Sequence, residues 1–233
     1  MKTAIYNLII LDESGSMDCV KRQTISGCNE TINTICSAQE KYAETQEHYV
    51  SIYVFQENNQ VSSRYLIKNQ PISKVAHIHE ELYKPWGFTP LYDAVGETLA
   101  DLKAVVKDRE MAIGCVTIIT DGMENASKHY TGEKVAKMID ALKGMGWSFN
   151  FIGANIDVKG TAASLNIDNA LEFQQDEAGT QAMFASELNS RMAYYGRANE
   201  AITECASSCA DSEEERSNRW KRLREAAADY FKM

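Results

Sequence analysis

Two patterns of hydrophobic and polar positions alternate along this chain, and each pattern predicts one kind of secondary structure. Short, continuously apolar runs that are rich in β-branched and aromatic residues predict buried strands. They cover residues 7–12, 49–55, 112–121 and 147–154, with a last short strand at 170–173. Stretches in which apolar residues recur every three or four positions predict amphipathic helices. They begin near residue 17 and continue at 91–108, 132–146, 158–165, 178–207 and 212–233.

The order of these elements predicts the fold class. Buried strands that alternate with helices are typical of an α/β fold, in which a doubly wound, mostly parallel sheet carries helices on both faces. One exception is expected at residues 62–69, which follow the strand at 49–55 after the turn-forming segment ENNQ. This stretch is predicted to add an antiparallel edge strand.

Three of the predicted helices carry apolar stripes that indicate which side packs inward. The stripes are Ile25, Cys28, Ile32 and Ile35 in the first helix, Phe184, Leu188, Met192 and Tyr195 in the helix at 178–207, and Trp220, Leu223, Ala227 and Phe231 in the last. The last helix has two interpretations: it packs back onto the domain, or it docks onto an assembly partner.

The chain is expected to form one main domain, residues 1–195, followed by a helical extension, residues 196–233. Its 233 residues, 44% of them hydrophobic, are enough to bury one sizeable core. It has only three prolines and no linker rich in glycine and serine, which argues against several independent modules.

Charge and cysteine content narrow the setting. The formal net charge of −9 and the pI near 5.0 argue against binding to nucleic acid, because phosphate contacts need clustered lysine and arginine. The apolar run at 7–12 is too short to span a membrane and lacks the cleavage pattern of a secretory signal. The six cysteines without an export signal are interpreted as reduced thiols, so a cytoplasmic protein is expected.

Polar residues follow two of the predicted strands at the point where each ends. Asp12 ends the first strand and is followed by Ser14 and Ser16, while Asp121 ends the strand that begins at 112. Ligands of doubly wound sheets bind beyond the carboxyl ends of the strands, where the strand order reverses. We therefore expect the two carboxylates to face one crevice. In an extended turn, the two serine hydroxyls point to the same side and Glu13 points away.

Thr89, in the loop that opens the helix at 91–108, adds a third hydroxyl, and Gly87 allows close backbone approach there. Two carboxylates and three hydroxyls, with no thiolate or imidazole, suit Mg²⁺, with Mn²⁺ or Ca²⁺ as alternatives. Asp12 and Asp121 at most neutralise a divalent ion, so the ion can still bind a carboxylate from outside. The alternative is that Ser16 only caps the following helix.

These residues together resemble the von Willebrand factor type A domain with its metal-ion-dependent adhesion site, in the stand-alone intracellular form found in bacteria and phages. The family's D-x-S-x-S pattern, its threonine in a G-x-T loop and its aspartate in a T-D-G turn are matched by Asp12, Ser14, Ser16, Thr89 and Asp121. The resemblance covers residues 4–190. It implies the fold described above, a bound divalent cation, and a protein partner that supplies an Asp or Glu to that cation. By analogy, it also implies a role beside an ATPase or in a stress or defence assembly.

Enzymatic activity receives little support from the sequence. The residues around Ser14 do not form the G-x-S-x-G elbow of a serine hydrolase, and no P-loop string is present. Two alternatives to an interaction module stay open: a metal-dependent phosphohydrolase, and a scaffold whose site is vestigial.

The remaining polar candidates are expected to have structural roles. His77 and His79 lack further ligands that would complete a metal site, and Glu124 and Asn125 are interpreted as rim and turn residues. Cys205 and Cys209 lie four positions apart in a predicted helix and are expected to be thiols on one face of that helix.

Overall fold

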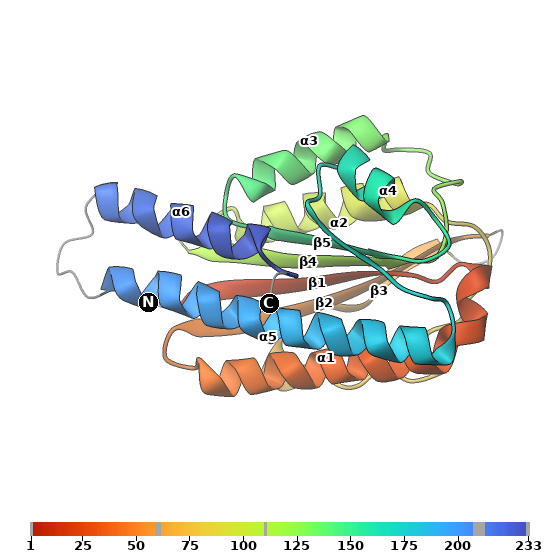
Figure 1. Ribbon diagram of the computed structural model, residues 1–233, viewed down its shortest axis with the longest axis horizontal. Coiled ribbons are helices and arrows are strands. Elements are labelled where there is room, and N and C mark those ends of the chain that lie inside the picture. Colours follow the sequence, from red (N-terminus) through yellow and green to blue (C-terminus); the bar gives the residue numbers. More distant parts are fainter. Residues whose placement is uncertain (1, 59–61, 110, 207–212, 232–233) are drawn as a thin grey trace.

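The computed structural model describes residues 2–58, 62–109, 111–206 and 213–231, and within these ranges a six-stranded sheet lies between two layers of helices (Figure 1). The strands are β1 (Thr3–Asp12), β2 (Gln46–Glu57), β3 (Ser62–Pro71), β4 (Ala112–Thr120), β5 (Ser148–Gly153) and β6 (Asn169–Glu172). The helices are α1 (Lys21–Lys41), α2 (Leu91–Val106), α3 (Gly132–Lys143), α4 (Val158–Ser164), α5 (Glu177–Ala206) and α6 (Glu213–Ala228), with short 3-10 helices η1 (Gly15–Val20) and η2 (Ile72–Lys74).

The sheet has the order β3-β2-β1-β4-β5-β6, and every neighbouring pair is parallel except β2 and β3. This confirms the predicted α/β fold with a mostly parallel sheet and one antiparallel edge strand. The turn predicted at ENNQ lies partly outside the described residues. β1 begins four residues earlier than predicted, because Thr3 already pairs with Gln46 of β2 and Ala4 with Ala112 of β4.

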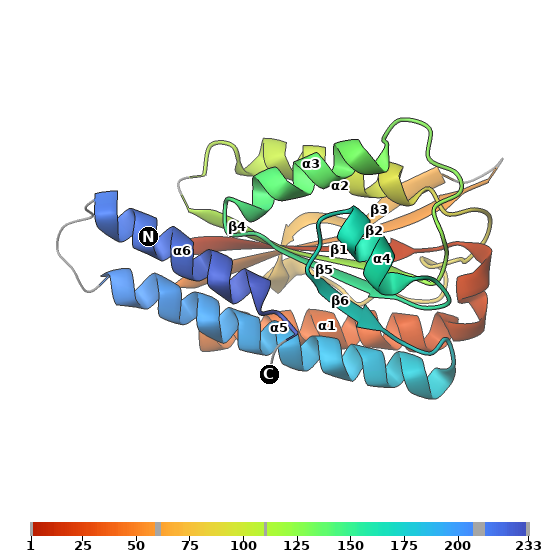
Figure 2. The ribbon, with the colours of Figure 1, turned by 45° about the horizontal axis from the view of Figure 1, so that its top comes forward.

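The central strand β1 is buried at all ten positions, and its side chains divide between two cores. Ile5 and Ile9 belong to the core formed with α1, α5 and α6, while Leu8 and Ile10 belong to the core formed with α2, α3 and α4. The two helical layers lie on opposite faces of the sheet in both views (Figures 1 and 2). A strand covered on both faces needs apolar side chains at consecutive positions, which explains its continuous hydrophobic run.

The C-terminal helix packs back onto the domain, which was the first of its two interpretations. Leu223, Ala227 and Tyr230 are buried in the same core as α1 and α5, and Trp220 and Phe231 pack against that core. Helix α5 runs without a break through the boundary expected at residue 195. That expected boundary therefore coincides with no interruption of the backbone. None of the described helices has the length and apolar character needed to cross a membrane.

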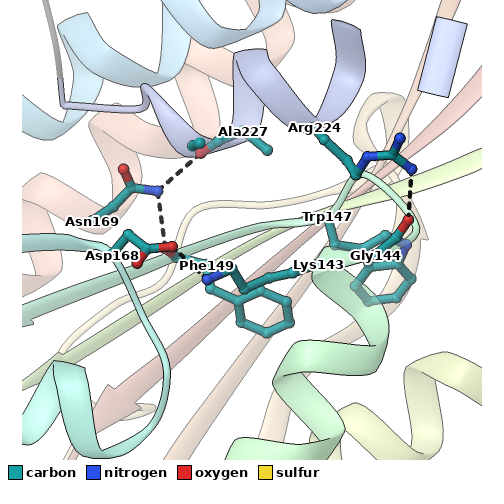
Figure 3. A pocket seen from close by; sticks show the side chains of 9 residues that line it. Lys143, Gly144, Trp147, Phe149, Asp168, Asn169, Arg224 and Ala227 are labelled. Atoms are coloured by element: carbon teal, nitrogen blue, oxygen red, sulfur yellow. Dashed lines mark hydrogen bonds and ion pairs between the residues drawn. The ribbon is translucent and has the colours of Figure 1, made fainter. Parts of the chain in front are cut away.

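Hydrogen bonds around a small pocket attach α6 to the edge of the sheet (Figure 3). Asn169 at the start of β6 donates from Nδ2 to the Ala227 carbonyl at 2.9 Å. Arg224 of α6 donates to the Gly144 carbonyl at 3.2 Å. α6 therefore contacts both the strand edge and the turn that ends α3.

The buried face of α5 differs from the predicted stripe because it carries charge. Arg191 is fully buried and pairs with Glu187 at 2.6 Å between Nη2 and Oε1. Its guanidinium also donates to Thr117 Oγ1 of β4 at 2.8 Å and to Asn7 Oδ1 of β1 at 3.3 Å. Tyr230, beyond α6, donates to the same Glu187 oxygen at 3.0 Å. One buried ion pair thus links α5 to two strands and to the C-terminal segment.

Phe184 and Tyr195 of the predicted α5 stripe are buried, but Leu188 and Met192 are only half-buried. The inward face is rotated toward Glu187 and the residues one and two turns beyond it. Spacing of apolar residues cannot identify the buried face of a helix when the centre of that face is an ion pair.

We expect Leu223→Ala to destabilise the whole domain by about 3 kcal/mol, because it opens a cavity where a leucine is fully buried. Urea unfolding followed by circular dichroism measures this, with Lys221→Ala, at an exposed position of the same helix, as the matched control. If Leu223→Ala unfolds at the wild-type urea concentration, α6 is a separable extension, as the boundary at residue 195 would require.

We expect Arg191→Met alone to cost about 3–5 kcal/mol of unfolding free energy, because it leaves the Glu187 carboxylate buried without a cation. The double variant Arg191→Met with Glu187→Leu should recover at least half of that loss, since no buried charge remains. Urea unfolding of both variants checks this. A double variant no more stable than the single one would show that hydrogen bonding, rather than charge pairing, makes Arg191 important.

Candidate metal centre

The predicted ligands gather at the edge of the sheet formed by the carboxyl ends of β1 and β4. Leu11 of β1 pairs in register with Ile119 of β4, which brings Asp12 beside Thr120. Thr120 Oγ1 donates to Asp12 Oδ2 at 2.6 Å, and Asp121 follows directly. The parallel pairing therefore places both acidic residues at one edge, as predicted.

The loop after β1 places its two serine hydroxyls together. Ser14 Oγ and Ser16 Oγ lie 3.2 Å apart, and Ser16 Oγ donates to Asp121 Oδ1 at 2.7 Å. The Ser14 backbone N–H donates to Asp12 Oδ1 at 2.7 Å, which closes the turn. The Ser16 hydroxyl therefore joins the two acidic loops, and η1 begins without a side-chain cap.

Thr89 reaches the same place from the loop before α2. It is buried, and its backbone exchanges two hydrogen bonds with Asn125: Thr89 N–H to Asn125 Oδ1 at 2.8 Å, and Asn125 N–H to the Thr89 carbonyl at 3.1 Å. A Cβ atom at Gly122 would lie 3.0 Å from Thr89 Oγ1 and 3.7 Å from Asp12 Oδ2. The Thr89 hydroxyl and the Asp12 carboxylate thus flank one glycine, and all five predicted residues converge.

Glu13, between the predicted ligands, anchors the Thr89 loop from the opposite side of the chain. Its buried carboxylate accepts two hydrogen bonds from Arg64 of β3, at 2.6 and 3.1 Å, and one from the Lys84 backbone N–H at 2.6 Å. Its carbonyl accepts from the Trp86 N–H at 2.8 Å. The sequence indicated that Glu13 points away, but not this role. An acidic side chain on the buried side of such a turn needs a basic side chain as its partner. That requirement could have pointed to Arg64.

Gly87 allows the close approach that was expected of it. Its φ of +79° favours glycine, and a Cβ atom there would lie 2.5 Å from the Glu57 carbonyl oxygen. The neighbouring Phe88 exchanges two backbone hydrogen bonds with Glu57, at 3.0 and 3.1 Å, and the Gly15 N–H donates to the Gly87 carbonyl at 3.3 Å. The Thr89 loop is thereby attached both to the end of β2 and to the serine loop.

Gln175, in the connection from β6 to α5, contacts the site without having been predicted. Its Nε2 donates to Asp121 Oδ2 and, at 2.8 Å, to the Ser16 carbonyl. Its Oε1 accepts from Asn155 Nδ2 at 2.5 Å. Gln175 therefore orients the Asp121 carboxylate from outside the predicted ligand set. No local motif marks it, because the contact spans distant parts of the chain.

The other polar candidates have the structural roles that were expected. Glu124 accepts backbone hydrogen bonds from Ser127 at 2.8 Å and from Tyr92 of α2 at 2.9 Å, which holds the loop after Asp121. His77 and His79 are exposed. Cys19, Cys28, Cys36 and Cys115 are free thiols, and the prediction that Cys205 and Cys209 share a helix face stays untested because Cys209 lies outside the described residues.

Burial makes the two ligand carboxylates costly to ionise. Desolvation raises the pKa of Asp12 to about 7, although hydrogen bonds from Thr120 and Ser14 lower it. The pKa of Asp121 is also raised by burial, against hydrogen bonds from Ser16 and Gln175. Among the described residues, no ion pair joins Asp12 or Asp121 to a lysine or arginine.

This donor set fits a hard divalent cation. A cation would supply the positive charge needed to compensate two buried carboxylates. Carboxylate and hydroxyl oxygens are the ligand atoms that Mg²⁺, Mn²⁺ and Ca²⁺ prefer. The described part of the chain has no group of three or more His, Cys, Asp or Glu side chains placed to hold a metal. A cation at this edge would therefore depend on the hydroxyls of Ser14, Ser16 and Thr89 as well as on the acids.

Comparison with known proteins gives no match by sequence, either to a family model or to a curated protein. By structure, the chain is similar to the von Willebrand factor type A protein from Catenulispora acidiphila, with a TM-score of 0.52 and 17% identity over 82% of this chain and 43% of that one. This chain has a von Willebrand factor type A fold. The chain is also similar to the pilus adhesin SpaC from Lactobacillus rhamnosus GG, with a TM-score of 0.59 and 12% identity over 84% of this chain and 30% of SpaC.

A third similar structure is that of proximal thread matrix protein 1 from the mussel byssus, solved with zinc in its metal-ion-dependent adhesion site motif. Its TM-score is 0.53 and its identity 12%, over 82% of this chain and 46% of the mussel protein. The chain spans less than half the length of each of these three proteins. The similarity therefore concerns the von Willebrand type A fold alone.

In the metal-free protein, we expect the contribution of Asp12 to the free energy of unfolding to fall as pH rises. Its folded pKa of about 7 lies above its ordinary value of 3.8, so the folded state holds this proton more tightly than the unfolded state does. The contribution is fully favourable below the ordinary value and is lost as pH rises through about 7. Urea unfolding in EDTA from pH 5 to pH 8 should show Asp12→Asn gaining stability relative to wild type as pH increases.

The matched control for this comparison is Asp18→Asn, because Asp18 is an exposed carboxylate in the neighbouring η1. Its unfolding free energy should follow that of the wild type across the pH range. Parallel profiles for Asp12→Asn and wild type would show that burial does not perturb Asp12.

Proposed function

We propose that this chain is a divalent-cation-dependent protein interaction module, which binds an acidic residue of a partner through Mg²⁺, or alternatively through Mn²⁺ or Ca²⁺. The observation that carries the proposal is the convergence of Asp12 and Asp121 with the hydroxyls of Ser14, Ser16 and Thr89. Both acids are buried, and no ion pair between described residues involves either of them. Such a site attracts a cation and leaves it able to accept one more carboxylate.

Each ligand has a distinct part in this proposal. Asp12 and Asp121 supply all the negative charge, so together they at most neutralise a divalent cation. The serine and threonine hydroxyls add oxygen donors without adding charge. A bound cation supplies a positive centre to which a partner's Asp or Glu can coordinate. Ser16 is exposed while Ser14 is buried, so the partner would approach from the Ser16 side.

The similar structures support this proposal by what their names state. The mussel protein holds zinc at its adhesion motif, and SpaC is an adhesin. By analogy with stand-alone members of the fold, we place the chain in the cytoplasm of a bacterium or phage host, in an assembly beside an ATPase or in stress or defence. We expect neither nucleic acid nor a membrane surface as its partner, because the chain carries a net charge of −9. We also propose that it is not an enzyme.

Replacing Asp121 with alanine should weaken cation binding on the order of 100-fold, because it removes one of two charges from the site. Thr89→Ala removes a neutral donor and should weaken it less. Calorimetric titration with Mg²⁺ and Mn²⁺ measures both, with Asp18→Ala as the control for a nearby exposed carboxylate. Far-UV circular dichroism should be unchanged in EDTA, since the sheet is held together by continuous apolar strands in which Asp12, the last residue of β1, is the one proposed ligand. Normal cation affinity in Asp121→Ala would remove the basis of the proposed site.

The three candidate functions separate in two further measurements. A scaffold with a vestigial site would show no cation binding in the titration. A metal-dependent phosphohydrolase would hydrolyse generic phosphoester substrates in the presence of Mg²⁺ or Mn²⁺, and the interaction module would not. Capture of proteins from a lysate in Mg²⁺, compared with EDTA and with Asp121→Ala, then identifies partners whose retention depends on the cation.

A further inference from the structure

Large apolar side chains are exposed around the candidate metal centre. Among the described residues, the most exposed large hydrophobic side chains are Met123, Trp86 and Phe88, at 72%, 70% and 63%. All three lie on the loops that carry Thr89 and Asp121. A soluble surface that exposes large apolar side chains together commonly marks an interaction site.

A surface hollow of about 880 Å³ lies beside these loops. Its lining includes Gly15, Trp86, Phe88, Asn125 and Lys128. Gly15 stands between the two serines of the proposed site, and Asn125 holds the Thr89 backbone. The hollow and the proposed cation site therefore share three loops: the serine loop after β1, the Thr89 loop and the loop after Asp121.

The two aromatic residues of the hollow are attached to a fixed backbone. The Trp86 N–H donates to the Glu13 carbonyl at 2.8 Å, and Phe88 exchanges two hydrogen bonds with Glu57. Gly87 between them has the positive φ that this path requires. A loop backbone that is held in place before binding reduces the entropy lost when a partner docks.

The charges at the hollow balance one another. Lys128 Nζ lies 2.5 Å from Glu57 Oε1, and these are the charged residues that line it within the described part of the chain. A hollow with this pairing and two exposed aromatic side chains favours an apolar occupant over a second acidic one. The strong attraction for an acid is confined to the neighbouring cation site.

We infer that the hollow receives a large aliphatic or aromatic side chain from the same partner segment that supplies the acid to the cation. This inference rests on the proposed function. The recognised motif is an Asp or Glu with a large apolar residue a few positions away, because the hollow and the cation site share loops and an extended chain advances about 3.3 Å per residue. An apolar contact beside the cation excludes water, which lowers the local dielectric and strengthens the bond between cation and carboxylate. Trp86 and Phe88 thereby select the partner, and the cation anchors it.

The inference is tested with a displayed peptide library that has Asp at the centre and random residues at four positions on each side. Selection on the wild-type protein in Mg²⁺ should enrich large apolar residues at one fixed offset from the Asp. The double variant Trp86→Ala with Phe88→Ala should still require Mg²⁺ and Asp but should lose the apolar preference. Met145→Ala, an exposed apolar position before β5 at the opposite edge of the sheet, is the matched control and should select like wild type.

Individual enriched peptides then give affinities by fluorescence polarisation. Replacing the apolar residue of a peptide with alanine should weaken its binding to wild type on the order of tenfold and leave its binding to the double variant unchanged. Equal loss with both proteins would show that the residue contacts another surface, and would overturn the inference.

The outcomes distinguish this inference from the proposed function. Selection of the Asp in Mg²⁺ without any apolar preference overturns the inference and leaves the proposed function standing. Equal enrichment from a library with Asn at the centre, or in EDTA, overturns both, as does a library without any Mg²⁺-dependent enrichment. Self-association of the chain in Mg²⁺ that is lost in the double variant would assign the hollow to a second copy instead of a partner.

Discussion

The parallel pairing of β1 with β4 is the constraint on which the candidate site depends. Because parallel strands end at the same edge, this pairing brings two carboxylates to one place and buries both, and a hydrogen bond of 2.6 Å from Thr120 to Asp12 joins the strand ends. Burial opposes ionisation there, and the described residues provide no basic partner for either acid. The edge therefore has the electrostatic character of a cation site before any cation is considered.

Alternation along the loop after β1 separates binding from support. Asp12, Ser14 and Ser16 face the candidate cation site, while Glu13 between them faces Arg64 and the loop that carries Thr89. The same short stretch thus supplies three proposed ligands and positions a fourth. Since the buried Glu13 carboxylate accepts from the Lys84 N–H and the Glu13 carbonyl accepts from the Trp86 N–H, the Thr89 loop and its exposed aromatic residues are attached to the end of the central strand.

The face of the sheet covered by α1, α5 and α6 is organised around a buried ion pair. Arg191 and Glu187 tie α5 to the strands, and Tyr230 brings the C-terminal segment into the same hydrogen-bond network. Gln175, just before α5, contacts Asp121 at the candidate site. The C-terminal helices therefore take part in the core, and the segment leading into them also contacts the candidate metal centre.

Hydrophobic patterns along the sequence were enough to predict the strands and their mostly parallel arrangement, because such patterns are local properties. The five candidate ligands came from the spacing of Asp12, Ser14 and Ser16 together with the resemblance, which also matches Thr89 and Asp121, and they stay a prediction. Only the tertiary structure decided the inward face of α5, the packing of α6 and the contact of Gln175 with the site. Each of these depends on partners far away in the chain. Arg191 in particular is polar in sequence but buried in the fold, because its charge is compensated by neighbours that no local pattern brings together.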